Sequence, residues 1–212
     1  MDLDPSLREL VARVLARPRP VGRRTVIGVV GAPGAGKSTL AAAVVGELIA
    51  AGVAAAQVPM DGFHLADVQL NRLGLRRVKG APPTFDGDGY AVLLERLRGD
   101  RDRAIYAPNF ERDLEQPLAG AIAVEPEIDI VVTEGNYLLL QDDPWPRTRA
   151  ACDEVWFVDV DQEVRLDRLI ARHVLFGKSP QDAREWVMRN DEANARLVIA
   201  GRESADLVVR MA

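Results

Sequence analysis

The feature that most constrains this chain of 212 residues is a glycine-rich segment between a strand-like run and a helix-like run. It has the spacing Gly, four free positions, Gly, Lys and Ser. Glycines let the backbone curl until successive N–H groups point at one spot, and the positive end of the following helix adds to their attraction for an anion. We therefore predict a phosphate-binding loop made of Gly31, Ala32, Pro33, Gly34, Ala35, Gly36, Lys37, Ser38 and Thr39.

The last residues of this loop indicate which ligand it takes. The Lys37 side chain can reach the β- and γ-phosphates of a nucleotide, and the Ser38 hydroxyl can coordinate Mg²⁺. A glycine-rich turn without a ligand is the alternative. It is disfavoured because residues 25–30 form an apolar strand pattern and residues 40–45 continue as a helix. We expect ATP and Mg²⁺ as cofactors.

Composition narrows the class of protein. Hydrophobic residues make up 48% of the chain, which is typical of a globular protein, and the net charge of −5 argues against nucleic acid as the main partner. No apolar run is long enough to cross a membrane, and the acidic residues 1–5 do not resemble a signal peptide. Cys152 is the single cysteine and cannot form an internal disulfide. We expect a soluble, cytoplasmic protein.

Apolar strand patterns alternate with helical patterns along the chain, which predicts an α/β fold. Strands this apolar belong to a parallel sheet with helices on both faces, the three-layer sandwich of P-loop NTPases. The first helix precedes the core and is expected on its outside. Strands are predicted at 25–30, 53–60, 128–133, 154–160 and 205–209, and helices at 6–16, 37–51, 65–73, 89–98, 162–175 and 180–200.

We interpret residues 1–212 as one kinase-like domain with three additions. The N-terminal helix lies within residues 1–20, and residues 165–180 form a small lid. Residues 74–125 are rich in proline and turns, and we expect them to form an excursion on the acceptor side, with 104–106 and 121–124 paired as a hairpin.

Charged residues follow three of the predicted strands. Ligands of open parallel sheets bind beyond the carboxyl ends of the strands, so Lys37, Asp61 and Glu134 should converge on one crevice. That set suits phosphoryl transfer to an alcohol, with Asp61 accepting the proton and Glu134 joining Ser38 at Mg²⁺. The alternative for Asp61 is a helix cap, and Glu134 has a structural alternative too.

A basic helix follows the fourth strand. Arg165, Arg168 and Arg172 lie three and four residues apart and share one helix face, with Lys178 beyond the flexible Gly177. We predict a lid over the triphosphate, with Arg172 catalytic and Arg168 and Lys178 on the phosphates. Interleaved acidic residues leave a solvated helix face as the alternative.

The acceptor site should draw on the middle of the chain, where aromatic and charged residues could cover and hold a small molecule. Lys79 is one of only three lysines in an arginine-rich chain, which suggests that lysine is needed there, although an ordinary surface lysine remains the alternative. Core packing is the alternative for Tyr106 and Phe110. The predicted residues are Phe63, His64, Lys79, Phe85, Asp86, Tyr106, Arg112 and Asn136.

Several of these motifs resemble the phosphoribulokinase, uridine kinase and bacterial pantothenate kinase group of P-loop kinases, over about residues 26–209. Residues 60–65 (MDGFHL) resemble the motif whose aspartate is the catalytic base, residues 79–86 resemble a pantothenate kinase stretch, and residues 132–137 (VTEGNY) match the Glu-Gly motif. The resemblance is greatest to a bacterial branch labelled nucleoside/nucleotide kinase or fructose-transport-associated kinase. It also implies that Asn190, Asn194 and Arg202 lie near the adenine.

We therefore expect an ATP- and Mg²⁺-dependent kinase that phosphorylates a hydroxyl of a small metabolite. A sugar, a nucleoside and a pantothenate-like alcohol all fit as acceptors, and the resemblance makes a homodimer possible. Two other classes stay open, namely a P-loop ATPase or switch that acts on a protein partner and a binding protein that keeps the fold without activity. The intact set of Lys37, Ser38, Asp61 and Glu134 disfavours the last of these.

Overall fold

The central strand β1 (Thr25–Gly31) is buried along its whole length because its residues are apolar on both faces. In the computed structural model, which describes residues 4–211, it lies between β5 (Ile130–Gly135) and β6 (Glu154–Val160). The outer strands are β2 (Ala55–Pro59) and β7 (Leu207–Met211), and the strand order is β2-β5-β1-β6-β7. All neighbours pair in parallel, as predicted.

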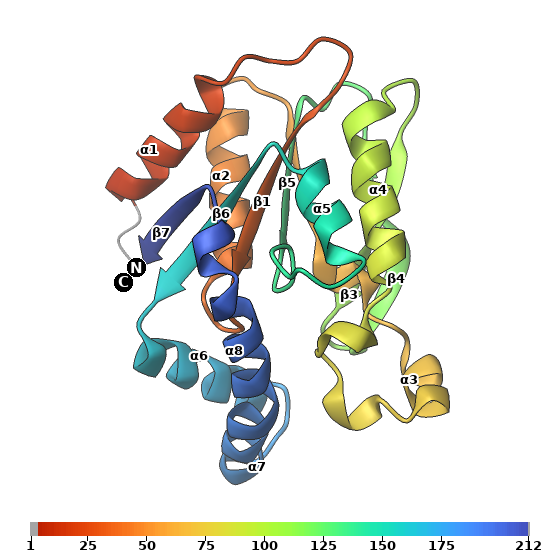
Figure 1. Ribbon diagram of the computed structural model, residues 1–212, viewed down its shortest axis with the longest axis vertical. Helices are drawn as coiled ribbons and strands as arrows, with labels where there is room; N and C mark the ends of the chain where they lie inside the picture. The colour runs from red at the N-terminus through yellow and green to blue at the C-terminus, as the bar shows by residue number, and fades with distance from the viewer. Residues whose placement is uncertain (1–3, 212) are drawn as a thin grey trace.

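Helices cover both faces of this sheet, which confirms the predicted three-layer α/β fold. Figure 1 shows α1 (Asp4–Leu15) and α2 (Lys37–Ala50) on one side of the sheet. The other side carries α4 (Gly87–Gly99) and α5 (Trp145–Ala151). Helix α1 packs on α2, on the outside of the core, as expected.

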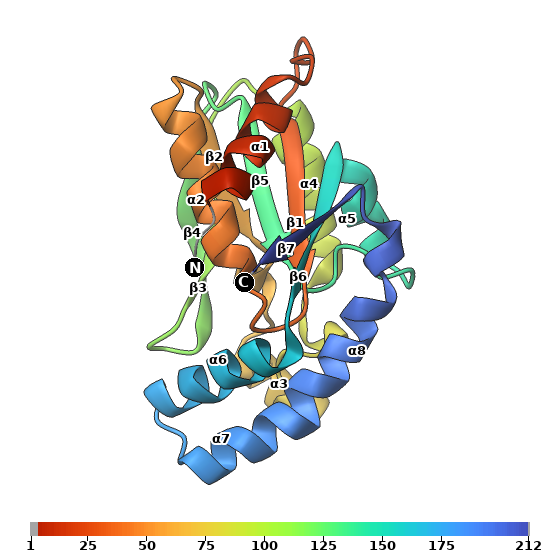
Figure 2. The ribbon, with the colours of Figure 1, turned by 90° about the vertical axis from the view of Figure 1, so that its left-hand side faces the viewer.

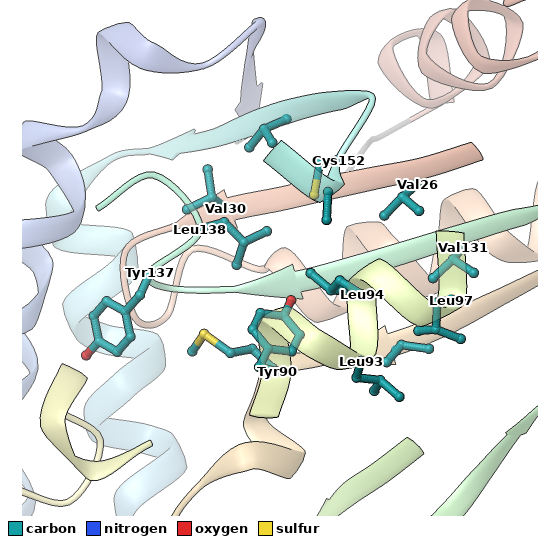
Figure 3. Close-up of a cluster of buried hydrophobic side chains, with 14 of the residues drawn as sticks. Val26, Val30, Tyr90, Leu93, Leu94, Leu97, Val131, Tyr137, Leu138 and Cys152 are labelled. Atoms are coloured by element: carbon teal, nitrogen blue, oxygen red, sulfur yellow. The ribbon is translucent and has the colours of Figure 1, made fainter. Parts of the chain in front are cut away.

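The alternation of side chains along β1 produces two apolar cores. Ile27 and Val29 face α1 and α2, whereas Val26 and Val30 face α4 and α5. Tyr90 and the leucines of α4 complete the second core, which Figure 3 shows beside Val131 of β5. Each fully buried side chain of this size contributes about 1.5–3 kcal/mol, so the sheet is a firm base for the loops at its carboxyl end.

The predicted hairpin exists and is longer than expected. Strands β3 (Ile105–Glu111) and β4 (Gln116–Val124) form a separate antiparallel sheet. It lies against the 3₁₀ turn η1 (Met60–Phe63) that follows β2. The contact is so close that a Cβ on Gly62 would lie 2.4 Å from the carbonyl oxygen of Pro108.

A second set of helices lies below the sheet in Figure 2. Helix α6 (Gln162–Leu175) has the predicted bounds. The predicted helix at 180–200 is confirmed as one helical stretch of α7 (Pro180–Trp186) and α8 (Glu192–Ala200). A π turn, η4 (Val187–Asp191), joins them and was not predicted.

The remaining elements are short. Helix α3 (Asp67–Leu73) and the 3₁₀ turns η2 (Arg76–Val78) and η3 (Pro82–Thr84) lead from η1 to α4, and η5 (Arg202–Ser204) precedes β7. Helix α5 was not predicted. Between residues 4 and 211 we find no helix with the length and apolarity needed to cross a membrane. The part of the N-terminal prediction that concerns residues 1–3 falls outside the described residues.

Candidate functional site

The phosphate-binding loop has the backbone shape that its glycines predict. Gly34 and Gly36 have φ angles of 81° and 90°, in the left-handed region that favours glycine. A Cβ on Gly34 would also lie 2.7 Å from Cγ of Leu169 and 2.9 Å from the carbonyl oxygen of Arg165. Helix α2 begins directly after the loop, at Lys37. The loop therefore presents backbone N–H groups at a helix N-terminus, an arrangement that binds phosphate.

The three predicted charged residues line one pocket of about 260 Å³, at the carboxyl ends of β1, β2 and β5. Lys37 follows β1, Asp61 lies in η1 just after β2, and Glu134 lies at the end of β5. Strand order explains the convergence, because β5 lies between β1 and β2. Asn136, which follows β5, also lines the pocket.

Ser38 and Glu134 form the part of the pocket that suits Mg²⁺. The Ser38 hydroxyl donates to Oε1 of Glu134 over 2.8 Å, which sets two oxygen ligands side by side next to the loop. Mg²⁺ prefers oxygen ligands and is usually held by one or two carboxylates together with substrate phosphates. Within residues 4–211, no group of three or more His, Cys, Asp or Glu side chains is arranged so that it could hold a metal ion by itself, and this mode of binding needs none.

Burial changes the ionisation of the loop lysine and its acidic neighbour. Burial lowers the pKa of Lys37, and the carboxylates of Glu134 and Asp61 oppose the effect. Burial, followed by the nearby charge of Asp61, raises the pKa of Glu134 to about 7. The Lys37 ammonium donates to the carbonyl oxygen of Ala32 over 3.2 Å, which holds it beneath the loop.

Asp61 lies half-buried among positive groups. Burial would raise the pKa of its carboxyl group, but His64, Arg112 and Lys37 outweigh it and hold the pKa below its usual value. Nη2 of Arg112 donates to Oδ2 of Asp61 over 3.0 Å. Asp61 is therefore ionised at neutral pH, which is the form that a proton acceptor needs. Its side chain lines the pocket, so the helix-cap alternative for it is not supported.

The acceptor-side wall is built around three aromatic rings. The His64 ring lies between Phe85 and Phe110, with centroid distances of 4.0 and 4.7 Å. Lys79 lies over the Phe110 ring at 5.5 Å and donates to Oδ1 of Asp67 over 2.8 Å and to the carbonyl oxygen of Glu115. His64, Lys79, Phe85 and Arg112, all predicted, line the pocket together with Phe110.

The opposite wall comes from α6, the π turn and α8. Arg172 and Lys178 line the pocket, and a lid formed by this segment stays a prediction. The Lys178 ammonium lies 5.0 Å from the ring centre of Trp186, and Nε2 of His173 lies 2.9 Å from Oδ2 of Asp191. Burial lowers the pKa of Arg172, as does the charge of Arg112 across the pocket.

Arg165 corrects the prediction for the basic helix face. Its side chain is buried, and Nη1 donates to the carbonyl oxygen of Pro33 over 3.3 Å while Nη2 pairs with Glu192. It therefore joins the phosphate loop to α8 and does not face the pocket. Arg168 does not line the pocket, although its Nη1 atom lies 4.0 Å from where a Cβ on Gly36 would sit.

Three predicted acceptor residues lie elsewhere. Phe63 packs on Tyr90, with ring centres 5.2 Å apart, at the edge of an apolar core. Asp86 caps α4 by accepting from the backbone N–H of Gly89. Tyr106 is 65% exposed because alternate residues of β3 point away from η1. The residue types of all three suited the site. Core packing of Phe63, the capping role of Asp86 and the outward face of β3 at Tyr106 keep their side chains out of it.

The π turn carries one pocket residue that the sequence did not reveal, Asp191. Asn194, which the family resemblance singled out, also lines the pocket, and Nδ2 of Asn190 donates to the carbonyl oxygen of Arg77 over 3.2 Å. The extra residue of a π turn shifts the helix face, so a regular helical period misplaces these side chains. Asn190 and Asn194 lie beside residues 77–81, and Arg202 pairs with Asp159 at the end of β6. Their expected place near the adenine stays a prediction. Arg76, Glu115 and Trp186 are further lining residues outside the prediction.

A family model for the methylmalonyl Co-A mutase-associated GTPase MeaB matches residues 4–63. The match covers the first strand, the phosphate loop and the following helix, and it spans less than a third of the chain. It therefore agrees with a nucleotide-binding loop and does not extend to the acceptor side or the lid.

Similarity to individual proteins extends over nearly the whole chain. A protein of Schizosaccharomyces pombe, provisionally named uridine kinase C227.14, is 34% identical over 197 residues, which are 89% of this chain and 83% of that protein. The protein YggC of Escherichia coli is 34% identical over 98% of this chain and 85% of its own length.

A crystal structure from Silicibacter sp. TM1040 extends the similarity to the fold. That protein, described provisionally as a fructose transport system kinase, is 38% identical and superposes with a TM-score of 0.88 over 96% of this chain and 98% of its own. Identity at this level across whole chains, together with the loop and the pocket described above, establishes the family. The chain belongs to a uridine kinase-like group of P-loop kinases.

Proposed function

We propose that this protein transfers the γ-phosphoryl group of ATP to a hydroxyl group of a small metabolite. The observation that carries the proposal is the convergence of Lys37, the Ser38–Glu134 pair and Asp61 on one pocket. Relatives named as ATP-dependent or uridine kinases support the reaction. Their names do not agree on an acceptor, so the acceptor is not transferred from them.

Each residue has a part in this reaction. The loop N–H groups and Lys37 bind the phosphates, and Ser38 and Glu134 hold Mg²⁺. When bound, Mg²⁺ neutralises phosphate charge and orients the transferring group. Asp61 accepts the proton of the attacking hydroxyl, and Arg172 stabilises the negative charge on the transferring group.

The test is the variant Asp61→Asn, measured by acceptor-dependent ADP release and, separately, by nucleotide binding. Removal of a general base costs about 10²–10⁴ in rate, whereas nucleotide affinity should stay near that of the wild type. Asp88→Asn is the matched control, because Asp88 is exposed on α4 and pairs with Arg147 outside the pocket. Near-normal turnover of Asp61→Asn would contradict the assignment of the base.

The same assay separates the kinase from the ATPase or switch. ADP release that needs an acceptor alcohol supports the kinase. Release that ignores every acceptor and is unchanged in Asp61→Asn would favour hydrolysis.

A further inference from the structure

The acceptor-side wall carries two positive groups next to one ring. Lys79 and Arg112 each lie over Phe110, with the charged atoms 5.5 Å from its centre. Both line the pocket, and Arg112 is next to Asp61. The two cations and the proposed proton acceptor therefore share one side of the site.

Both cations keep hydrogen-bonding capacity for a ligand. An ammonium group has three hydrogens to donate. Within the described part of the chain, Lys79 uses two of them, for Asp67 and the Glu115 carbonyl. Arg112 has five N–H donors, of which one bonds to Asp61.

The two cations differ in exposure, so we expect Lys79 to provide a fixed charge and Arg112 a side chain that can reorient. Only 7% of the Lys79 side chain is exposed, so its charge is fixed in the wall. The Arg112 side chain is 46% exposed and can reorient towards a ligand while its partner Asp61 turns to a hydroxyl. Planar guanidinium groups bind carboxylate and phosphate with two parallel hydrogen bonds.

The aromatic rings give little room to a nucleobase. His64 covers one side of Phe85 and of Phe110, and Lys79 and Arg112 flank Phe110 as well. On the opposite wall, Trp186 is flanked by Lys178 and Arg189. The pocket of about 260 Å³ lies below the size of most small-molecule sites, roughly 300–1,000 Å³, and it must also take the terminal phosphates. A compact acceptor fits it better than a nucleoside.

The acidic residues of this wall differ in how they are engaged. Asp67 pairs with both Lys79 and Arg76, whereas Glu115 lines the pocket at the hairpin tip and is exposed, so its carboxylate can turn to solvent. The carboxylate that bonds to Arg112 is Asp61, which the proposed reaction assigns to the acceptor hydroxyl.

We propose that the acceptor is a compact alcohol with a carboxylate or phosphate group, which Arg112 and Lys79 bind while its hydroxyl meets Asp61. This inference rests on the proposed function and names its substrate class. In the reaction the hydroxyl oxygen bonds to the γ-phosphorus of ATP, and the bond from that phosphorus to the β,γ-bridging oxygen breaks. ADP leaves with the bonding pair, and the hydroxyl proton passes to Asp61.

The test compares related alcohols with and without an acid group, by ADP release with Mg-ATP. The pairs are glycerol with D-glycerate and glycerol 3-phosphate, pantothenol with pantothenate, and ribulose with ribulose 5-phosphate, with uridine as a nucleoside. We expect the anionic member of at least one pair to exceed its neutral partner in kcat/KM by roughly 100-fold, because hydrogen bonds to charged groups are strong. The carboxylate and phosphate arms show which acid group the site prefers.

The variant Arg112→Gln then assigns the preference to its residue. We expect it to raise KM for the anionic acceptor by roughly 10- to 100-fold more than KM for the neutral partner, while kcat for both acceptors falls together because Arg112 also bonds to Asp61. Arg96→Gln is the matched control, since Arg96 is exposed on α4 and pairs with Asp100.

Three outcomes overturn the inference, and they differ in what else they affect. Preference for a neutral alcohol or for uridine refutes the substrate class and leaves the kinase intact. If Arg112→Gln still prefers the anionic acceptor, the assignment of the acid group to Arg112 is wrong. ADP release that no acceptor stimulates, with no binding of D-glycerate, glycerol 3-phosphate, pantothenate or ribulose 5-phosphate in the presence of Mg-ADP, refutes the proposed function as well.

Discussion

The phosphate loop and the acceptor-side wall hold their ligand groups by different means. The loop uses backbone shape, with Gly34 packed against Leu169 and Arg165 so closely that a methyl group does not fit. The wall uses side-chain ion pairs on half-exposed segments, such as Arg112 with Asp61 and Lys79 with Asp67. Backbone geometry cannot exchange partners, whereas an ion pair can. The difference suits a constant phosphate donor and a variable acceptor.

The largest effect should come from the link between the loop and α8. Arg165→Met leaves Glu192 as an uncompensated buried charge and removes the bond to Pro33. Removal of one partner of a buried pair lowers the free energy of unfolding by about 3–5 kcal/mol, which chemical denaturation can measure. The double variant Arg165→Met/Glu192→Met should be more stable than Arg165→Met alone. If the two single effects simply add, the pair is not coupled.

The loop side of the comparison is tested by Gly34→Ala. The new methyl group meets Leu169 and a backbone oxygen, and the positive φ of Gly34 adds strain of about 1–3 kcal/mol. Because displacement of a bound group by about 1 Å can cost 10²-fold in rate, we expect a loss of that order in turnover.

Gly46→Ala is the matched control for the loop. Gly46 lies within α2, and a Cβ there has open space around it. Alanine in a helix interior should raise the free energy of unfolding by about 0.5–1 kcal/mol. Normal turnover of Gly34→Ala would refute the view that loop shape is essential.

The wall is tested by Tyr137→Phe. The Tyr137 hydroxyl donates to the carbonyl oxygen of Gly80, next to Lys79. Its loss should lower the free energy of unfolding by about 1 kcal/mol, and we expect KM for the acceptor to rise more than KM for ATP. Tyr106→Phe is the control, since Tyr106 is exposed on the hairpin. A rise in KM for ATP alone would show that the Tyr137 hydroxyl supports the nucleotide site and not the acceptor-side wall.

The smallest effect concerns pH. Burial would raise the pKa of Asp67, but its hydrogen bond to Lys79 and the charges of Lys79 and Arg76 hold the pKa below its usual value. The pair therefore adds stability above the unfolded pKa of about 3.9, and this is lost as pH falls through the lower folded value.

Urea denaturation of wild type and Asp67→Asn at a series of pH values measures this contribution. The difference in unfolding free energy should be below about 1 kcal/mol at pH 7, as for other partly exposed pairs. It should shrink below pH 4. A difference that stays constant with pH would show that Asp67 does not stabilise the wall through its charge.

The parallel sheet and the glycine-rich loop were predictable because they follow from local pattern, whereas the strand order was not predicted. Residues 31–39 define the loop by themselves, and Asp61 and Glu134 were placed by the rule that parallel strands end at one edge of the sheet. Helix α6 has the predicted bounds because its apolar and polar faces are distinct.

The parts that the sequence did not reveal depend on contacts between distant segments. Arg165 shares the charge and spacing of Arg172, and only the packing of α6 on Pro33 and Glu192 separates a structural arginine from one in the pocket. Asp191 could be placed in the pocket only once the π turn was known. Tyr106 and Phe110 both lie on β3, and the register shift between Ala107 and Asn109 decides which ring meets His64.

The close contact between Gly62 and Pro108 has a further consequence. It clamps the hairpin to the same turn that carries Asp61, so the position of the proposed proton acceptor is tied to the base of the hairpin. The hairpin tip at residues 112–115 lies several residues beyond this clamp and contributes Arg112 and the Glu115 carbonyl to the wall. Substitutions at the tip can therefore change the groups offered to an acceptor without altering the turn that holds Asp61.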